Sequence, residues 1–214
     1  YNMAEHGCAA LKELSYNNDN TRLICDSGGL QAVVYAIETN PQILEVQKAG
    51  SQFLQNMTKF LPTTIIEISE SRVVPTLLEF FSMDNKNSSR WHTDSDFQLS
   101  VCGLITNVAT SKKTRENISS GSNNNIIGVV MGILEVTNDP DVKQSAILAL
   151  EYLSEDHIKN QNNIWLADGV ELFFQSIKSY HDNSALVTSS FNMIEQRIKD
   201  LDDETIVRKI ADVG

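Results

Sequence analysis

Apolar residues recur along this chain with the period of an α-helix. Five segments place them at positions i, i+3, i+4 and i+7, once the third segment is shifted by one residue. The segments are "MAEHGCAALKELS", "VQKAGSQFLQNMT", "FQLSVCGLITNVA", "VKQSAILALEYLS" and "LVTSSFNMIEQRI", which begin at Met3, Val46, Phe97, Val142 and Leu186. The pattern predicts five amphipathic helices of one design.

Aligning the five segments gives columns of similar residues, which indicates an internal repeat. One apolar column recurs every 43 to 51 residues and contains Leu11, Leu54, Ile105, Leu150 and Ile194. Three residues later a second apolar column contains Leu14, Met57, Val108 and Leu153, with Arg197 in fifth place, where we expect the core to end. Four residues before the first column stand Gly7, Gly50, Val101, Ala146 and Ser190, which are small enough for a neighbouring helix to approach closely.

A second aliphatic pattern precedes each of the last four helices. Its column contains Val33, Leu77, Val130 and Phe173 and has the same period. The one long interval contains a polar insertion, "DNKNSSRWHTDSD", at residues 84–96. Each unit of the repeat is therefore expected to hold at least two longer helices.

Short apolar runs could also be buried strands of a parallel sheet. Here the runs extend to ten or more residues, and no two-residue hairpin turn separates them. Asn40-Pro41 and Asp139-Pro140 are typical of a helix cap followed by proline at the first helical position. We therefore predict an all-α protein.

Composition narrows the class of partner. The chain has 214 residues and a net charge of -11, which disfavours nucleic acid and anionic membranes, because both require dense Lys/Arg patches. Cys8, Cys25 and Cys102 are far apart and indicate free thiols in a reducing compartment. The chain begins with Tyr1, so we expect a native N-terminal segment to be missing.

The stretch "NTRLICDSGGLQAVVYAIETNPQILEVQKAGSQFLQNM" resembles an armadillo repeat, and "NDPDVKQSAILALEYLS" resembles the end of another. The resemblance implies one right-handed superhelical solenoid over residues 1–214. It implies a partial repeat at 1–18, repeats at about 19–60, 61–111, 112–156 and 157–199, and a C-terminal capping helix at 201–214.

In the armadillo family the last helices of the units line a concave groove that binds peptides or partner helices, and a repeated Asn reaches the peptide backbone. Carried over by column, the groove residues here are Glu13, Gln52, Asn56, Gly103, Asn107, Leu148, Tyr152, Asn192 and Gln196. Only Asn56 and Asn107 match the family's Asn. The tryptophans that nuclear import receptors place one turn earlier are missing, which argues against an import role.

Several of these residues have a purely structural alternative. Asn56 and Asn107 could be amides that stabilise helices rather than groove contacts. Tyr152 could anchor a partner or pack against the next repeat. Trp91, in the insertion loop, could serve function or fold back to bury its ring.

The sequence has no catalytic motif of the HExxH, GxSxG or P-loop type, and its four histidines, His6, His92, His157 and His181, are far apart in the chain. His157 follows two acidic residues and is interpreted as a solvated helix end. The "DSGGLQAV" stretch could cradle a phosphate, but it has no lysine, and Gly28 falls where the other units have Arg72, Asn125 and Asp168. We interpret it as a turn between helices.

We therefore expect a non-enzymatic protein-binding scaffold or adaptor without metal, cofactor or small-molecule substrate. Its partners would be proteins with basic or helical segments, in the cytoplasm. The family resemblance extends to small scaffolds that tether organelles such as rhoptries from the cytosolic face through an acylated N-terminal segment. The alternatives are an armadillo-type nucleotide-exchange co-chaperone of Hsp70 and a regulatory domain of a larger protein.

Overall fold

The computed structural model describes residues 3–82, 94–120 and 125–200 of the chain. Within these ranges it contains thirteen α-helices and no β-strand. The prediction of an all-α protein is therefore confirmed, and the alternative of buried parallel strands is wrong. Two predicted features, the loop residue Trp91 and the capping helix at 201–214, lie outside the described residues.

After α1 (Met3–Leu14), the helices follow in four triplets of a shorter first, an intermediate second and a longer third helix. The first helices are α2 (Asn18–Asp26), α5 (Thr64–Glu70), α8 (Lys112–Ser119) and α11 (Ile158–Leu166). The second helices are α3 (Gly29–Thr39), α6 (Val73–Ser82), α9 (Ile126–Val136) and α12 (Gly169–Ser179). The third helices are α4 (Leu44–Phe60), α7 (Ser95–Val108), α10 (Pro140–Ser154) and α13 (Ser184–Asp200).

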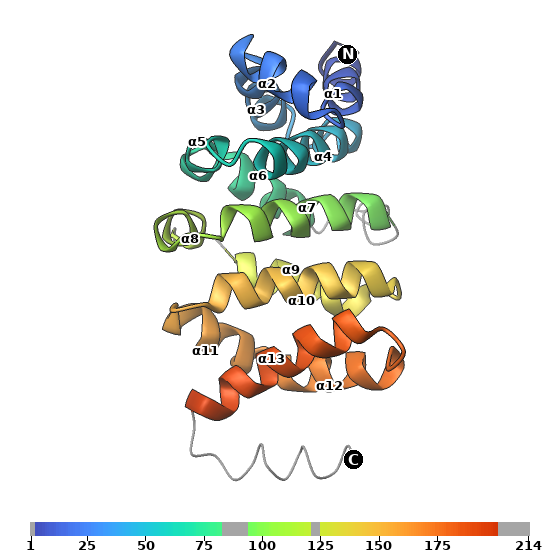
Figure 1. Ribbon diagram of the computed structural model, residues 1–214, viewed down its shortest axis with the longest axis vertical. Helices are drawn as coiled ribbons and strands as arrows, with labels where there is room; N and C mark the ends of the chain where they lie inside the picture. The colour runs from blue at the N-terminus through green and yellow to red at the C-terminus, as the bar shows by residue number, and fades with distance from the viewer. Residues whose placement is uncertain (1–2, 83–93, 121–124, 201–214) are drawn as a thin grey trace.

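The third helices are stacked on one another along the long axis of the molecule. Figure 1 shows α1, α4, α7, α10 and α13 following one another along the long axis in chain order, and each packs on the next. The second helices α3, α9 and α12 pack against the third helices of their own triplets. The fold is thus helical and repeat-like, with the third helices side by side.

The predicted apolar columns lie in the core, with an exception in α1. Val33, Leu77, Val130 and Phe173 are all buried, as are the four later members of both third-helix columns wherever the residue is apolar. In α1, however, Leu11 is half-buried and Leu14 is 49% exposed. The difference arises because no described triplet stands on the outer side of α1, so only its inner side is covered.

The two proline signals have different outcomes. Pro140 is the first residue of α10, and the Asp139 side chain accepts hydrogen bonds from Asp141 and Val142 N–H groups, as predicted. Pro41 does not begin a helix, because α4 starts at Leu44. Asn40 instead ends α3. The last carbonyls there, of Ile37 and Asn40, accept hydrogen bonds from Gln47 Nε2 at 3.0 and 2.9 Å.

The glycine pair is a turn between two helices, as predicted. Gly28 has φ +80°, and its N–H donates to Cys25 O. Asp168 adopts the same left-handed conformation before α12, whereas Asn125 before α9 does not. The following glycine carries a stricter requirement, because a Cβ on Gly29 would overlap Ile24 Cγ2 and lie 2.9 Å from Ile24 O.

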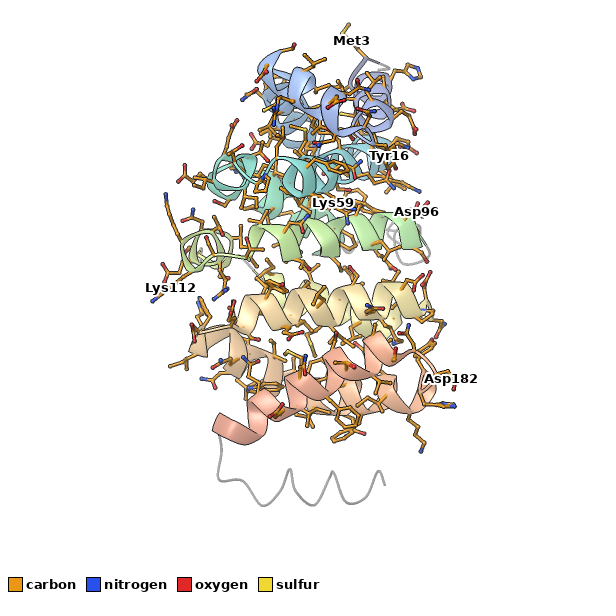
Figure 2. All side chains as sticks on the ribbon, in the orientation of Figure 1. Met3, Tyr16, Lys59, Asp96, Lys112 and Asp182 are labelled. Atoms are coloured by element: carbon orange, nitrogen blue, oxygen red, sulfur yellow. The ribbon has the colours of Figure 1, made fainter. Side chains whose placement is uncertain are left out.

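Polar contacts tie together the edge on which the third helices begin. Lys48 Nζ donates to both carboxylate oxygens of Asp94, at 2.9 and 2.8 Å. Ser95 forms a hydrogen bond with Asp139, and this bond is the main reason why the pKa of the Asp139 carboxyl is lowered. Tyr180 Oη donates to Asn138 O at 2.6 Å. This edge, where Figure 2 places both Asp96 and Asp182, links successive triplets.

We expect Gly29→Ala to lower the free energy of unfolding by about 1–3 kcal/mol, because its Cβ would meet side-chain and backbone atoms of Ile24. Gly132, inside α9, is the matched control. It has nothing within 4 Å of a built Cβ, so Gly132→Ala should gain about 0.5–1 kcal/mol from helix propensity. Urea unfolding followed by circular dichroism measures both. Equal effects of the two substitutions would show that the α2–α3 turn is not tightly packed.

Candidate functional site on the third helices

The predicted groove residues lie on α1 and the third helices. Glu13 is exposed near the end of α1 and pairs with its neighbour Lys12 at 2.7 Å. The other eight, two on each third helix, are Gln52, Asn56, Gly103, Asn107, Leu148, Tyr152, Asn192 and Gln196. Among these eight only Asn192 is exposed, and the rest are half-buried. Most of the predicted face therefore packs partly against its own molecule.

Hydrogen bonds join successive third helices through this face. Asn56 Nδ2 donates to Ser15 Oγ at 3.0 Å, just beyond the end of α1. One unit later, Asn107 Nδ2 donates to Thr58 Oγ1 at 2.9 Å. At the other end of the molecule, Ser154 Oγ donates to Gln196 Oε1 at 3.1 Å. An amide in one unit thus meets a hydroxyl in the unit before it, and we call this series the amide–hydroxyl ladder.

For the amide nitrogens of Asn56 and Asn107, the ladder favours the interpretation that these side chains stabilise the helices. Both Nδ2 groups donate within the molecule. Among the described residues no donor reaches either Oδ1 atom, so each amide keeps one acceptor. These side chains therefore stabilise the stack and can still accept one hydrogen bond at the surface.

The ladder has a gap at Tyr152. In the unit of α7, the hydroxyl position of the ladder is occupied by Ala109, which has no hydroxyl. The other units have Ser15, Thr58 and Ser154 at this position. The aromatic ring of Tyr152 takes the amide's place and packs partly against the core. Tyr152 also lines a hollow on this face, so its ring packs against the core and stays partly accessible.

This hollow lies between α10 and α13 and has a volume of about 580 Å³; we call it the C-terminal hollow. Four of the predicted residues line it, and four further residues were not predicted. The lining consists of Leu148, Glu151, Tyr152, Glu155, Ser189, Asn192, Glu195 and Gln196. None of the eight is basic, and three are glutamates.

Burial and neighbours set the electrostatics of the C-terminal hollow. Burial raises the pKa of the Glu151 carboxyl, a hydrogen bond from Asn192 opposes the rise, and the charge of Glu155 adds to it. Glu155 is paired with Arg115 of α8, whose Nη2 lies 2.6 Å from Glu155 Oε2. The Arg115 side chain is only 4% exposed and also donates to the carbonyl oxygens of Ala109 and Glu155. The Arg115 guanidinium is therefore held by these contacts and is not among the residues that line the hollow.

A smaller hollow of about 160 Å³ lies near the other end of the face. Gln52 and Asn56 contribute to it together with residues that were not predicted. The complete lining is Tyr16, Gln52, Gln55, Asn56, Asp96, Leu99 and Ser100. Between the hollows the predicted face is covered, because the Gln55 side chain lies over Gly103, where a Cβ would overlap its Nε2. Six of the predicted residues thus line these two hollows, and Gly103 and Asn107 line neither of them.

Sequence reasoning missed the acidic part of the C-terminal hollow. Glu151 and Glu155 stand one helical turn apart on either side of Tyr152, a signal that was available in the sequence. Arg115 stands 40 residues earlier on α8, the first helix of the same triplet, and nothing in its surroundings along the chain indicates that it reaches Glu155. Only the folding of the triplet brings α8 and the end of α10 together.

The described residues contain no group of three or more His, Cys, Asp or Glu side chains that could hold a metal ion. Burial raises the pKa of Cys8 to about 11 and that of Cys102 to about 12, which disfavours nucleophilic thiolates there. His157 caps α11, its Nδ1 accepting from Asn160 N at 3.2 Å. No helix in the described ranges is long and apolar enough to span a bilayer.

Comparison with known proteins addresses the fold alone. No family model matches the chain, and no curated protein matches it. A solved structure of an engineered protein is similar, with a TM-score of 0.68 and 20% sequence identity, over 89% of this chain and 71% of that one. At this identity the likeness supports a shared helical arrangement and carries no function.

For the ladder, we expect Asn107→Ala to lower the free energy of unfolding by about 0.5–1.5 kcal/mol, because it removes the hydrogen bond to Thr58. A double-mutant cycle with Thr58→Val isolates the pair. Asn163→Ala, on the exposed face of α11, serves as the control, with a smaller expected change. Additive effects of Asn107→Ala and Thr58→Val would mean that this hydrogen bond contributes nothing to stability.

For the C-terminal hollow, we expect Glu151→Gln and Glu155→Gln to have opposite effects near neutral pH. The folded-state pKa of Glu151 is raised, so its ionised form destabilises the fold and the penalty is relieved as pH falls through that pKa. Glu151→Gln should therefore stabilise the protein by less than about 1 kcal/mol, a gain that shrinks on acidification. Glu155→Gln should destabilise it, because buried Arg115 loses its partner. Urea midpoints at several pH values measure both, and destabilisation by Glu151→Gln would contradict the assignment.

Proposed function

We propose that this chain is a non-enzymatic scaffold of the armadillo type whose third helices line a binding groove for a partner peptide or helix with basic side chains. In this proposal the triplets form a right-handed superhelix, and the C-terminal hollow is its main recognition site. The observation that carries the proposal is the lining of that hollow. Leu148, Tyr152, Asn192 and Gln196 line it together with three glutamates.

The chemistry of the hollow favours a cation. Among the residues whose side chains are described, its lining has three carboxylates and no lysine or arginine, and the guanidinium of Arg115 is committed to Glu155. A guanidinium or ammonium group placed in the hollow would be attracted by the negative charge of its lining. The Tyr152 ring adds a face on which a cation or its aliphatic stem can stack.

The size of the hollow favours side chains of a chain-like partner. Its volume of about 580 Å³ is within the usual range for binding pockets, but it is open to solvent and bounded by the third helices α10 and α13. Leu148 supplies apolar surface, while Asn192 and Gln196 supply amides that can bond a peptide backbone. A peptide lying across α10 and α13 can therefore use both kinds of contact.

The stack orders this site before a partner arrives. The Ser154–Gln196 hydrogen bond fixes α13 against α10, and Ser154 is itself fully buried. Because the site is already ordered, the entropic penalty of binding falls mainly on the partner. This is the physical advantage of a scaffold built from packed helices over one built from loops.

We expect arginine-containing peptides to bind this chain and the same peptides with citrulline in place of arginine to bind much more weakly. Citrulline keeps the shape of the side chain and removes its charge. Fluorescence anisotropy at two salt concentrations measures both affinities, and binding should weaken as salt rises. In Glu151→Gln with Glu195→Gln, affinity for the arginine peptides should fall about tenfold.

The matched control is Glu45→Gln with Glu116→Gln, which removes the same charge from exposed positions outside the hollow. This control should bind like the wild type, apart from a small loss of long-range attraction. Equal weakening by both pairs would show only a general charge effect. Equal affinity for arginine and citrulline peptides would contradict the proposed recognition site.

A further inference from the structure

The outer side of α1 exposes a row of residues whose equivalents are buried in α4. Met3 is 89% exposed and Leu14 is 49% exposed, and Gly7 and Ala10 between them are exposed as well. Their equivalents in α4, one unit later, are all buried: Val46, Gly50, Phe53 and Met57. We call Met3, Gly7, Ala10 and Leu14 the α1 outer face, and Figure 2 shows Met3 at the outer end of the stack.

The structure itself shows what covers this face in the next unit. A Cβ built on Gly50 would lie 2.7 Å from Ile37 Cδ1 and 3.5 Å from Val33 Cγ1, both on α3. The second helix therefore lies directly on the glycine of the third helix. The equivalent Gly7 has nothing within 4 Å of a built Cβ. Within the described residues α1 has the receiving surface but no second helix on it.

We propose that the α1 outer face is a docking surface for one amphipathic helix with the apolar pattern of α3. The occupant places aliphatic side chains where α3 places Leu30, Val33 and Ile37, which are at most 1% exposed. Gly7 allows the two helix backbones to approach closely, and Met3 and Leu14 close over the occupant on either side. Continuity with the α3–α4 interface is the argument for a helix of this kind.

A second copy of the chain fits this surface less well. Two α1 helices meeting face to face would bring together two molecules that each carry a net charge of -11. The exposed Glu13 of each copy would also lie beside the contact. A helix with the composition of α3, whose buried side carries no charge, has neither disadvantage.

The sequence register provides a direct probe. Met3 aligns with Val46, so Tyr1 aligns with Leu44, the first residue of α4. A second copy of residues 18–43, which hold α2 and α3, can therefore be joined directly ahead of Tyr1 with the native spacing. The same segment can also be added as a separate peptide, which tests docking without a covalent link.

We expect the fused segment to raise the melting temperature of the full chain and to slow hydrogen exchange of the α1 amides. The free peptide of residues 18–43 should bind the wild-type chain with one-to-one stoichiometry in calorimetry. Ala10→Glu with Leu14→Glu should weaken peptide binding about tenfold or more, and should remove the gain in melting temperature from the fusion. Both positions are exposed, so this variant should fold.

The matched control is Ile158→Glu with Leu166→Glu, the same chemical change at exposed apolar positions of α11, which are 74% and 83% exposed. The control should bind the peptide like the wild type. Absence of peptide binding together with no gain from the fusion would overturn the proposal. Concentration-dependent dimers of the wild type that the α1 variant abolishes would overturn it in favour of a second copy.

Discussion

The packing of each third helix on the next is the contact on which the rest of this structure depends, and the amide–hydroxyl ladder holds it in register at every step except that from α7 to α10. Apolar side chains such as Leu54 and Ile105 supply the buried area, which is not directional. The hydrogen bonds from Asn56 to Ser15 and from Asn107 to Thr58 fix where along the helices the contact is made. The first two helices of each triplet pack against this stack of third helices.

The same constraint explains where the candidate site lies. Between α7 and α10 the ladder position holds Ala109, and Tyr152 stands where an amide would be. Arg115 uses the nearby space to reach the carbonyl of Ala109 and the carboxylate of Glu155. Tyr152, Glu151 and Glu155 all line the hollow between α10 and α13. A departure from the repeat, more than the repeat itself, marks the C-terminal hollow as a candidate for recognition.

Much of the fold could be predicted from the sequence, because a helix face buried against its neighbours leaves a periodic apolar pattern. The buried columns at Val33 and Leu54 are examples, and so is the cap of α10 at Asp139. The prediction that Pro41 begins a helix was wrong, because a proline can stand either at a helix start or in the turn before it. Half of the residues that line the C-terminal hollow followed from the columns. The pairing of Arg115 with Glu155 could not be predicted, since it depends on how the first and third helices of one triplet meet in space.

The assignment of the C-terminal hollow as a recognition site is tested most directly by an NMR titration of the isotope-labelled chain with an arginine-containing peptide. We expect the largest changes of amide chemical shift on α10 and α13, around Tyr152, Asn192 and Gln196. The same titration with the citrulline peptide should leave these signals nearly unchanged. Shift changes centred on other helices, or equal changes with both peptides, would contradict the assignment of the C-terminal hollow as the recognition site.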